Sequence, residues 1–198
     1  MLYWIARAVL GFVARVLFSV KVEGAEHLPL KGPVVLCSNH ISWWDPVIVA
    51  ITIPRPIHFM AKVELFRYPI FGPLLRHIHA FPVERGKPDL SAIRDSIAVL
   101  KDGKVLGIFP EGTRQRGKDT LGEMHSGAAL VALKTDAPVV PVAIRGPYGF
   151  RKTVTIAYGK PLSLENKTGR LSYDMQQGTR AIEDAIRALW QHLGEEVA

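Results

Sequence analysis

The segment SNHISWWDP, residues 38–46, places a histidine five positions before an aspartate that is followed by proline. On one continuous helix, residues five apart point about 140° away from each other, so contact between His40 and Asp45 requires a turn. Asp-Pro favours such a break, because aspartate is a favoured N-cap and proline a favoured first helical residue. We therefore expect a loop over residues 40–44 and a helix from Pro46. One oxygen of Asp45 is expected to cap that helix and the other to accept a hydrogen bond from His40.

This pair could act as a general base. An aspartate bound to one imidazole nitrogen fixes the tautomer, and the other nitrogen can then accept a proton from a hydroxyl group. A positioned base contributes roughly 10²–10⁴-fold in rate. The structural alternative is a helix cap beside an incidental histidine. Taken alone, the spacing of His40 and Asp45 is better explained by that alternative.

A second polar segment is FPEGTR, residues 109–114, at the end of a predicted strand. Its glycine turn offers backbone N–H groups, the Thr113 hydroxyl and the Arg114 guanidinium around the Glu111 carboxylate. Such a loop could bind an anion or stabilise a developing oxyanion. In isolation, an ordinary polar turn with a Glu111–Arg114 pair explains it better.

A third segment, residues 61–86, sets Lys62, Arg67, Arg76 and Arg85 among apolar residues. Arg85 follows an apolar run, where a guanidinium could bind a phosphate through two parallel hydrogen bonds. Arg67 and Arg76 are explained individually as solvated surface charges.

Strand and helix patterns alternate along the chain and predict an α/β fold, a mixed and largely parallel sheet flanked by helices. The expected strands cover residues 33–39, 57–62, 79–85, 104–110, 138–146 and 152–161. Beyond the helix from Pro46, the expected helices cover residues 89–103, 127–137 and 172–194, the last capped by Ser172 and ending near Gly194. Ligands of such sheets gather beyond the carboxyl ends of strands. His40, Lys62, Arg85 and Glu111 each follow a predicted strand, which indicates one shared cleft.

The N-terminal run over residues 2–18 is apolar except for Arg7 and Arg15. It is short and charged for a spanning helix, and it lacks the basic start and cleavage site of a signal peptide. Tyr3, Trp4 and the two arginines suit the depth of lipid headgroups. We therefore expect a membrane-associating helix over residues 1–20 and a single domain over residues 21–198. The alternative is a helix packed on that domain.

The composition limits the partners. The chain has 198 residues, 48% of them hydrophobic, and a formal net charge of +7, which suits a folded domain with an anionic partner. No basic cluster is interleaved with aromatics, so nucleic acid is not expected. Cys37 is the one cysteine, which fits a reducing compartment and permits no intrachain disulfide. The histidines show no metal-ligand spacing, so no metal is expected.

Five segments, in their order and spacing, resemble the motif blocks of the 1-acylglycerol-3-phosphate acyltransferases, within the glycerolipid acyltransferase family. They are NHISWWDP, AKVELFRYPIFGP, FPVERG, FPEGTRQRG and VPVAIRG. The resemblance spans roughly residues 22–160. It implies an α/β sheet flanked by helices, with N-terminal helices that dock on the membrane.

The resemblance also implies roles for individual residues. His40 is expected to be the general base and Asp45 its orienting partner, while Arg85 and Lys62 meet the phosphate of the acceptor lipid. Glu111, Gly112 and Thr113 are expected to line the acceptor site, with Arg114 counted among the substrate-binding residues of the same loop.

The implied reaction makes phosphatidic acid from lysophosphatidic acid and an acyl thioester. No cofactor is expected beyond acyl-CoA or acyl carrier protein as cosubstrate, and no acyl-enzyme, because the chain has no Gly-x-Ser-x-Gly elbow. The expected location is the cytoplasmic face of the cell membrane, peripheral or monotopic. The alternatives are another lyso-lipid or glycerol 3-phosphate as acceptor, a thioester hydrolase, and a non-catalytic lipid-binding protein.

Two positions depart from the family pattern. His125 stands where many members have a lysine after FPEGTR. His79 stands where a glycine often lies two positions before the phenylalanine of the second block. Both changes could alter acceptor preference.

Overall fold

The computed structural model describes residues 2–84, 86, 89–115, 120–165 and 168–195. Its seven-stranded sheet has the order β1-β7-β6-β2-β5-β3-β4, and every neighbouring pair is parallel except the antiparallel β6–β7. The strands are β1 Phe18–Glu23, β2 Val34–Ser38, β3 Ile57–Lys62, β4 Phe81–Val83, β5 Val105–Ile108, β6 Val139–Arg145 and β7 Lys152–Tyr158. The predicted α/β fold with a mixed, largely parallel sheet is confirmed.

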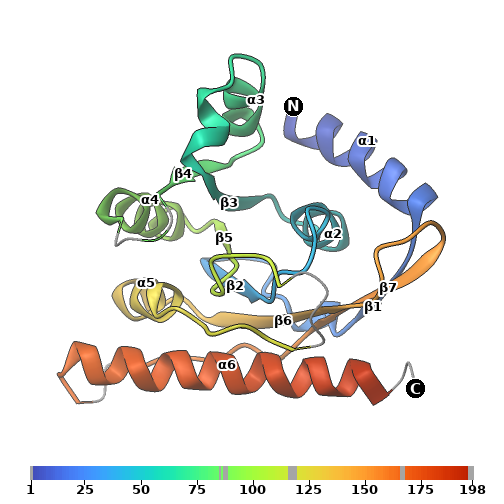
Figure 1. Ribbon diagram of the computed structural model, residues 1–198. Helices are drawn as coiled ribbons and strands as arrows, with labels where there is room; N and C mark the ends of the chain where they lie inside the picture. The colour runs from blue at the N-terminus through green and yellow to red at the C-terminus, as the bar shows by residue number, and fades with distance from the viewer. Residues whose placement is uncertain (1, 85, 87–88, 116–119, 166–167, 196–198) are drawn as a thin grey trace.

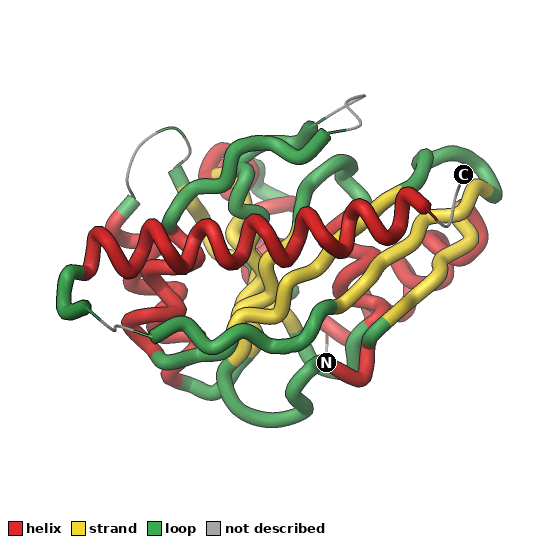
Figure 2. Tube along the Cα trace, turned by 90° about the horizontal axis from the view of Figure 1, so that it is seen from below, coloured by secondary structure: helices red, strands yellow, loops and turns green. Residues whose placement is uncertain are grey.

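Helices cover both faces of this sheet (Figure 1). The α-helices are α1 Leu2–Leu17, α2 Asp45–Thr52, α3 Phe71–His77, α4 Leu90–Lys101, α5 Gly127–Thr135 and α6 Leu171–Glu195. Two 3-10 helices are also present, η1 Ala25–His27 and η2 Val63–Arg67. The long α6 crosses one face, and in the view from below it lies in front of the strands (Figure 2).

The alternation of side chains along β2 divides the core into two layers. Val34 and Leu36 pack with the helices α1 and α2, whereas Val35 and Cys37 pack with α4, α5 and α6. Successive side chains of a strand point to opposite faces, so a strand covered by helices on both sides is apolar at every position. All five residues of β2 are buried, as this predicts. The strand ends at Ser38, which delivers His40 to the carboxyl edge of the sheet.

The N-terminal segment differs from its prediction. The helix ends at Leu17, and residues 18–23 form the edge strand β1, which pairs with β7. Phe18 is buried in the core, which removes it from any interfacial role and explains why the helix stops there. The expected boundary at residue 20 therefore falls inside a strand. Within the described residues, no helix is both long and apolar enough to cross a bilayer.

The helix α1 is packed on the domain along one side and exposed along the other. Tyr3 is buried, and its hydroxyl accepts a hydrogen bond from the Ile57 N–H at 3.2 Å. The guanidinium of Arg7 donates to the carbonyl oxygens of Ile51 and Ile53 at the end of α2. These two side chains, expected at headgroup depth, thus hold the helix to the protein. The exposed large apolar side chains of α1 are Leu2, Trp4, Ile5, Val9, Leu10, Phe12, Val13 and Val16.

Smaller differences concern the ends of elements. The strand β4 is shorter than the expected 79–85, and Arg85 lies outside the described residues. The helix α6 begins at Leu171 and continues through Gly194, so Ser172 is inside it and Gly194 does not end it. The 3-10 helix η2 and α3, between β3 and β4, were not predicted, because this stretch rich in proline and aromatics has no clear helical period.

Candidate active site

His40 and Asp45 meet as predicted. The His40 Nδ1 lies 2.7 Å from the Asp45 Oδ2, and the two residues are 6% and 0% exposed. Because an ionised carboxylate only accepts hydrogen bonds, His40 donates from Nδ1, and in the neutral imidazole the lone pair is then on Nε2. The same Oδ2 accepts from the N–H groups of Ile41 and Ser42, both at 2.7 Å. The loop is therefore folded around this one carboxylate oxygen.

The prediction that Asp45 caps the following helix is wrong. Asp45 is itself the first residue of α2, and Trp44 occupies the N-cap position. The second carboxylate oxygen, Oδ1, accepts a hydrogen bond of 2.6 Å from the Tyr148 hydroxyl. Tyr148 lies in the connection between β6 and β7, and its ring packs edge-to-face on Phe18. Burial, followed by the nearby carboxylate of Asp45, raises the pKa of this hydroxyl, which therefore remains a donor.

The FPEGTR loop fixes the backbone of His40. The Glu111 Oε1 accepts from the His40 N–H at 3.1 Å, and the Gln115 N–H donates to the His40 carbonyl oxygen at 2.8 Å. The Phe109 ring stacks on the imidazole with centroids 4.2 Å apart. Glu111 is buried, and burial raises the pKa of its carboxyl group, an effect that the His40 N–H partly offsets. Glu111 therefore contacts the backbone of His40, and its expected place in the acceptor site stays a prediction.

The next three residues of the loop, Gly112, Thr113 and Arg114, have surroundings that differ from those of Glu111. Thr113 is exposed, and Gly112 has a left-handed backbone (φ 65°), which glycine adopts without strain. His125 lies beside Gly112, since a Cβ added there would approach its ring at 3.2 Å. The Arg114 guanidinium carbon lies 3.7 Å from the centroid of the Trp43 ring.

The two adjacent tryptophans thus have separate surroundings. Trp43 is largely exposed and carries the Arg114 guanidinium on its face. Trp44 is partly buried and packs edge-to-face on Phe18 with centroids 5.5 Å apart. One tryptophan belongs to the rim of the site, and the other secures the loop to the core.

Asn39, which we did not predict, secures the same loop to the neighbouring strand. Its side-chain amide donates to the Ile144 carbonyl oxygen and accepts from the Ile144 N–H, at 2.9 and 2.7 Å. Asn39 is buried and immediately precedes His40. The one sequence feature that pointed to this role is the asparagine directly before His40.

Of the cationic residues, Lys62 lies at the carboxyl edge of the sheet. Lys62 ends β3, and its ammonium group pairs with Glu64 at 3.1 Å, with both side chains about half exposed. Lys62 is paired in register with Val83, the last residue of β4. Arg85 follows two positions later but lies outside the described residues. Arg67 and Arg76 are exposed, as expected for solvated charges.

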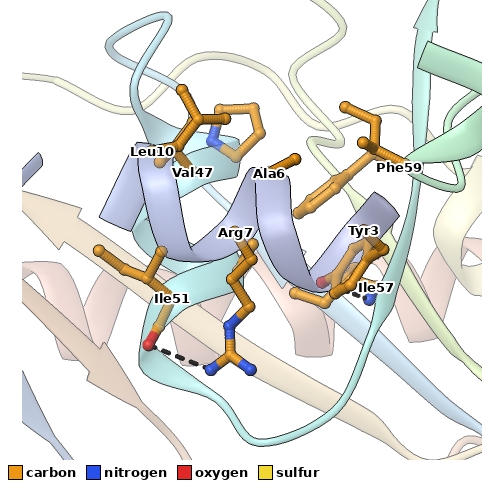
Figure 3. Close-up of a pocket in the computed structure, with 11 residues that line it drawn as sticks. Tyr3, Ala6, Arg7, Leu10, Val47, Ile51, Ile57 and Phe59 are labelled. Carbon is orange, nitrogen blue, oxygen red and sulfur yellow. Dashed lines mark hydrogen bonds between the residues drawn. The ribbon is translucent and has the colours of Figure 1, made fainter. Parts of the chain in front are cut away.

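A small apolar pocket lies under the N-terminal helix (Figure 3). It has a volume of about 90 Å³ and lies between α1, α2 and β3. Its lining includes Leu10, Val47 and Phe59. The Phe59 ring stacks on Phe109 with centroids 5.7 Å apart, and Phe109 in turn stacks on His40. Two aromatic rings therefore connect the pocket wall to the imidazole.

Other chemistries have less support in the described part of the chain. Burial raises the pKa of the Cys37 thiol to about 12, so this cysteine is a poor nucleophile. No group of three or more histidine, cysteine, aspartate or glutamate residues among those described is arranged to hold a metal ion.

Comparison with known proteins assigns the family. The family model described as Acyltransferase matches residues 19–145. A 1-acyl-sn-glycerol-3-phosphate acyltransferase of Bacillus subtilis is 40% identical over 72% of this chain and 73% of its own length. One of Streptococcus pneumoniae is 32% identical over 94% and 72%. The crystal structure of the 1-acyl-sn-glycerophosphate acyltransferase PlsC from Thermotoga maritima has a TM-score of 0.64 at 25% identity, covering 90% of this chain and 80% of that one. On this sequence and structural similarity, the chain belongs to the acyltransferase family.

Proposed function

We propose that this enzyme transfers a fatty acyl group from an acyl thioester to the sn-2 hydroxyl of 1-acylglycerol 3-phosphate, making phosphatidic acid. The names of the two bacterial relatives support this acceptor. The observation that carries the chemistry is the buried contact of 2.7 Å between His40 Nδ1 and Asp45 Oδ2, which directs Nε2 away as a base. The acyl donor is acyl-CoA or acyl carrier protein.

In the proposed mechanism, His40 Nε2 takes the proton of the acceptor hydroxyl while its oxygen attacks the thioester carbonyl carbon. Asp45 stabilises the imidazolium that forms. The tetrahedral intermediate then expels the thiolate as the carbon–sulfur bond breaks. The thiolate takes the proton back from His40, which leaves an ester, a free thiol and the neutral base.

The reaction passes through no acyl-enzyme in this proposal. The buried Cys37, with its raised pKa, does not offer a thiolate, and the chain lacks the serine elbow of acyl-enzyme hydrolases. The acceptor hydroxyl itself is the nucleophile. No metal or cofactor takes part beyond the thioester.

The acceptor phosphate is assigned to Lys62 and Arg85, near the carboxyl ends of β3 and β4. Guanidinium groups bind phosphate oxygens through two parallel bonds, and an ammonium adds a point charge. Gly112, Thr113 and Arg114 form the adjoining rim, where exposed Thr113 can reach the acceptor. Glu111 keeps a positioning role through the His40 N–H.

The apolar pocket of Figure 3 is the proposed start of the acyl-chain site. Its walls are apolar, and the ring of Phe59 connects it to His40 through Phe109. At about 90 Å³ it is smaller than the roughly 300 Å³ of a typical ligand pocket, so a bound chain must displace α1 or extend along it.

The enzyme is proposed to act at the cytoplasmic face of the cell membrane as a peripheral or monotopic protein. The exposed apolar side of α1 supports this, because such a face lies in the interface between headgroups and acyl chains. The net charge of +7 favours anionic lipids.

The test uses purified full-length protein, 1-acylglycerol 3-phosphate and palmitoyl-CoA in detergent, with thiol release followed and the lipid product identified. Wild type is expected to make phosphatidic acid, and His40→Ala to lose at least about a hundredfold in kcat. Free fatty acid as the main product would favour a thioester hydrolase instead. If no acceptor in a panel of lyso-lipids and glycerol 3-phosphate is acylated from either donor, the enzymatic proposal fails.

A further inference from the structure

The segment between β3 and β4, residues 63–78, consists of η2 and α3 and is called here the 63–78 hairpin. It stands at the end of the sheet, and α3 packs chiefly on η2 (Figure 1). Gly72 is its one buried residue. The hairpin thus contributes almost nothing to the core of the domain.

The hairpin nevertheless exposes large apolar side chains. Ile70 and Phe71 are 78% and 60% exposed, and Tyr68 and Leu74 are exposed beside them. The backbone around them is closely packed, because the Gly72 N–H donates to the Tyr68 carbonyl oxygen at 2.8 Å. A Cβ at Gly72 would also collide with the backbone of Phe66. The large apolar side chains around this closely packed glycine remain in solvent, and contiguous exposed apolar groups mark an interaction surface.

The charges beside this apolar group suit an anionic surface. Arg67 and Arg76 are both exposed, and the Arg76 guanidinium lies 5.3 Å from the Phe66 ring centroid. The acidic residue of the hairpin, Glu64, is paired with Lys62. Arginines beside a group of aromatic and aliphatic side chains match the level of anionic headgroups above the acyl chains.

The end of the hairpin also lies against α1. The Tyr3 ring lies 5.1 Å from the ring of His79, one residue beyond the hairpin. Ile78 lines the same pocket as Leu10 of α1. The start of α1 and α3 lie on the same side of the molecule, with α6 on the opposite side (Figure 1).

We propose that the 63–78 hairpin is a second membrane-contacting element, which inserts Ile70 and Phe71 into the same bilayer surface as the exposed side of α1. This inference rests on the membrane association proposed above and adds a second point of contact. Since the hairpin follows Lys62 at the carboxyl end of β3, its insertion brings that edge of the sheet, with His40, to the bilayer. A lipid acceptor can then reach the base without leaving the membrane.

The first experiment maps contact with an environment-sensitive fluorophore on engineered cysteines. Buried Cys37 does not compete for the label, and wild type checks this. The full chain carries the label at Ile70→Cys, at Phe12→Cys on α1, or at Tyr173→Cys on α6. It is mixed with vesicles of phosphatidylcholine and phosphatidylglycerol. The emission maximum of the label is expected to shift to the blue at positions 70 and 12 and to remain unchanged at position 173.

The outcomes separate the two proposals. A shift at position 12 alone means that α1 docks without the hairpin, which overturns this inference and keeps the membrane association. No shift at either position overturns both. If position 70 shifts without vesicles, and sedimentation shows a dimer, the hairpin binds a second copy and the inference is wrong. Catalytic turnover, measured separately in detergent, reports on the acyltransferase proposal independently of these results.

The second experiment removes the apolar contact. The double variant Ile70→Ser/Phe71→Ser is expected to weaken vesicle binding at least about tenfold, with its melting temperature and its kcat in detergent unchanged. The matched control, Leu171→Ser/Tyr173→Ser, replaces two exposed apolar residues of α6 and should bind vesicles like wild type. Equal binding by both double variants overturns the inference.

Discussion

Replacing Tyr148 by phenylalanine tests how Asp45, the proposed partner of the His40 base, is held. The substitution removes the hydroxyl that donates to the Asp45 Oδ1 at 2.6 Å and leaves the ring in contact with Phe18. Asp45 is 0% exposed, so water does not readily replace the lost donor. The Oδ2 keeps its three hydrogen bonds, one of them from His40. The dyad should therefore persist with a less tightly fixed carboxylate.

The size of the expected effect on kcat follows from the charge of the Asp45 carboxylate, which accepts this hydrogen bond. A hydrogen bond to a charged group contributes about 1.5–3 kcal/mol, and each 1.4 kcal/mol is about tenfold in rate. We expect part of this free energy to be lost from the stability of the fold. The other part should be lost from stabilisation of the transition state, in which Asp45 must stabilise the imidazolium of His40. Tyr148→Phe should therefore lower kcat about 5- to 30-fold with little change in KM. Asp45→Asn, which favours the wrong tautomer of His40, should lower it about 10³-fold or more.

A second buried tyrosine provides the control. The Tyr158 hydroxyl forms a hydrogen bond of 2.6 Å with the Thr52 hydroxyl, away from the dyad. Tyr158→Phe should lower the free energy of unfolding by about 0.5–1.5 kcal/mol and leave kcat unchanged. The assay is steady-state thiol release in detergent, with urea unfolding of each variant alongside. If Tyr148→Phe is destabilised but turns over like wild type, the hydroxyl serves folding alone and this reasoning is refuted.

Three further predictions concern buried or strained groups. Glu111→Gln keeps an acceptor for the His40 N–H and removes a carboxylate whose pKa burial has raised. The melting temperature of Glu111→Gln at pH 7.5 should therefore equal or exceed that of wild type. Glu111→Ala removes the acceptor and should lower kcat about tenfold. A higher melting temperature for Glu111→Ala than for Glu111→Gln would contradict this. His79 has a left-handed backbone with φ 67°, so His79→Gly should be more stable to urea than His79→Ala by about 1 kcal/mol, and the reverse order would exclude strain there. Burial, followed by His79 and Lys104, lowers the pKa of His58 to about 4, below the roughly 6.5 of an unfolded histidine, so the unfolded chain binds the extra proton. The free energy of unfolding should then fall by about 1 kcal/mol more in wild type than in His58→Phe between about pH 7 and pH 4.5, and parallel pH curves would contradict the assignment.

The pattern of the chain was sufficient for most of the sheet. The strands at residues 57–62 and 139–145 lie within a residue of their predicted positions, because continuous apolar runs between polar ends are typical of strands covered on both faces. Pro46 predicted the start of α2 to within one residue, and the helical spacing of apolar residues predicted α4. The strand β1 was missed, because its first residue, Phe18, ends the apolar run of α1 and its pairing with β7 is not visible in the local pattern.

The sequence by itself also determined that His40 and Asp45 meet. His40 and Asp45 are five positions apart, and Asp-Pro ends the loop between them, so their contact is a local consequence of chain geometry. The positions of Lys62 and Glu111 just after predicted strands likewise indicated one shared edge of the sheet. These predictions succeed because neighbouring residues and strand ends constrain one another through short-range sterics.

Only the tertiary structure decided how this pair is held. Tyr148 reaches Asp45 across 103 positions of the chain, Glu111 reaches His40 across 71, and Asn39 reaches Ile144 across 105. Local sequence patterns do not indicate whether the Tyr148 hydroxyl, the Glu111 carboxylate and the Asn39 amide are buried or solvated at the surface. Their partners are chosen when the sheet packs and buries them, because a buried polar group must find a hydrogen bond within reach.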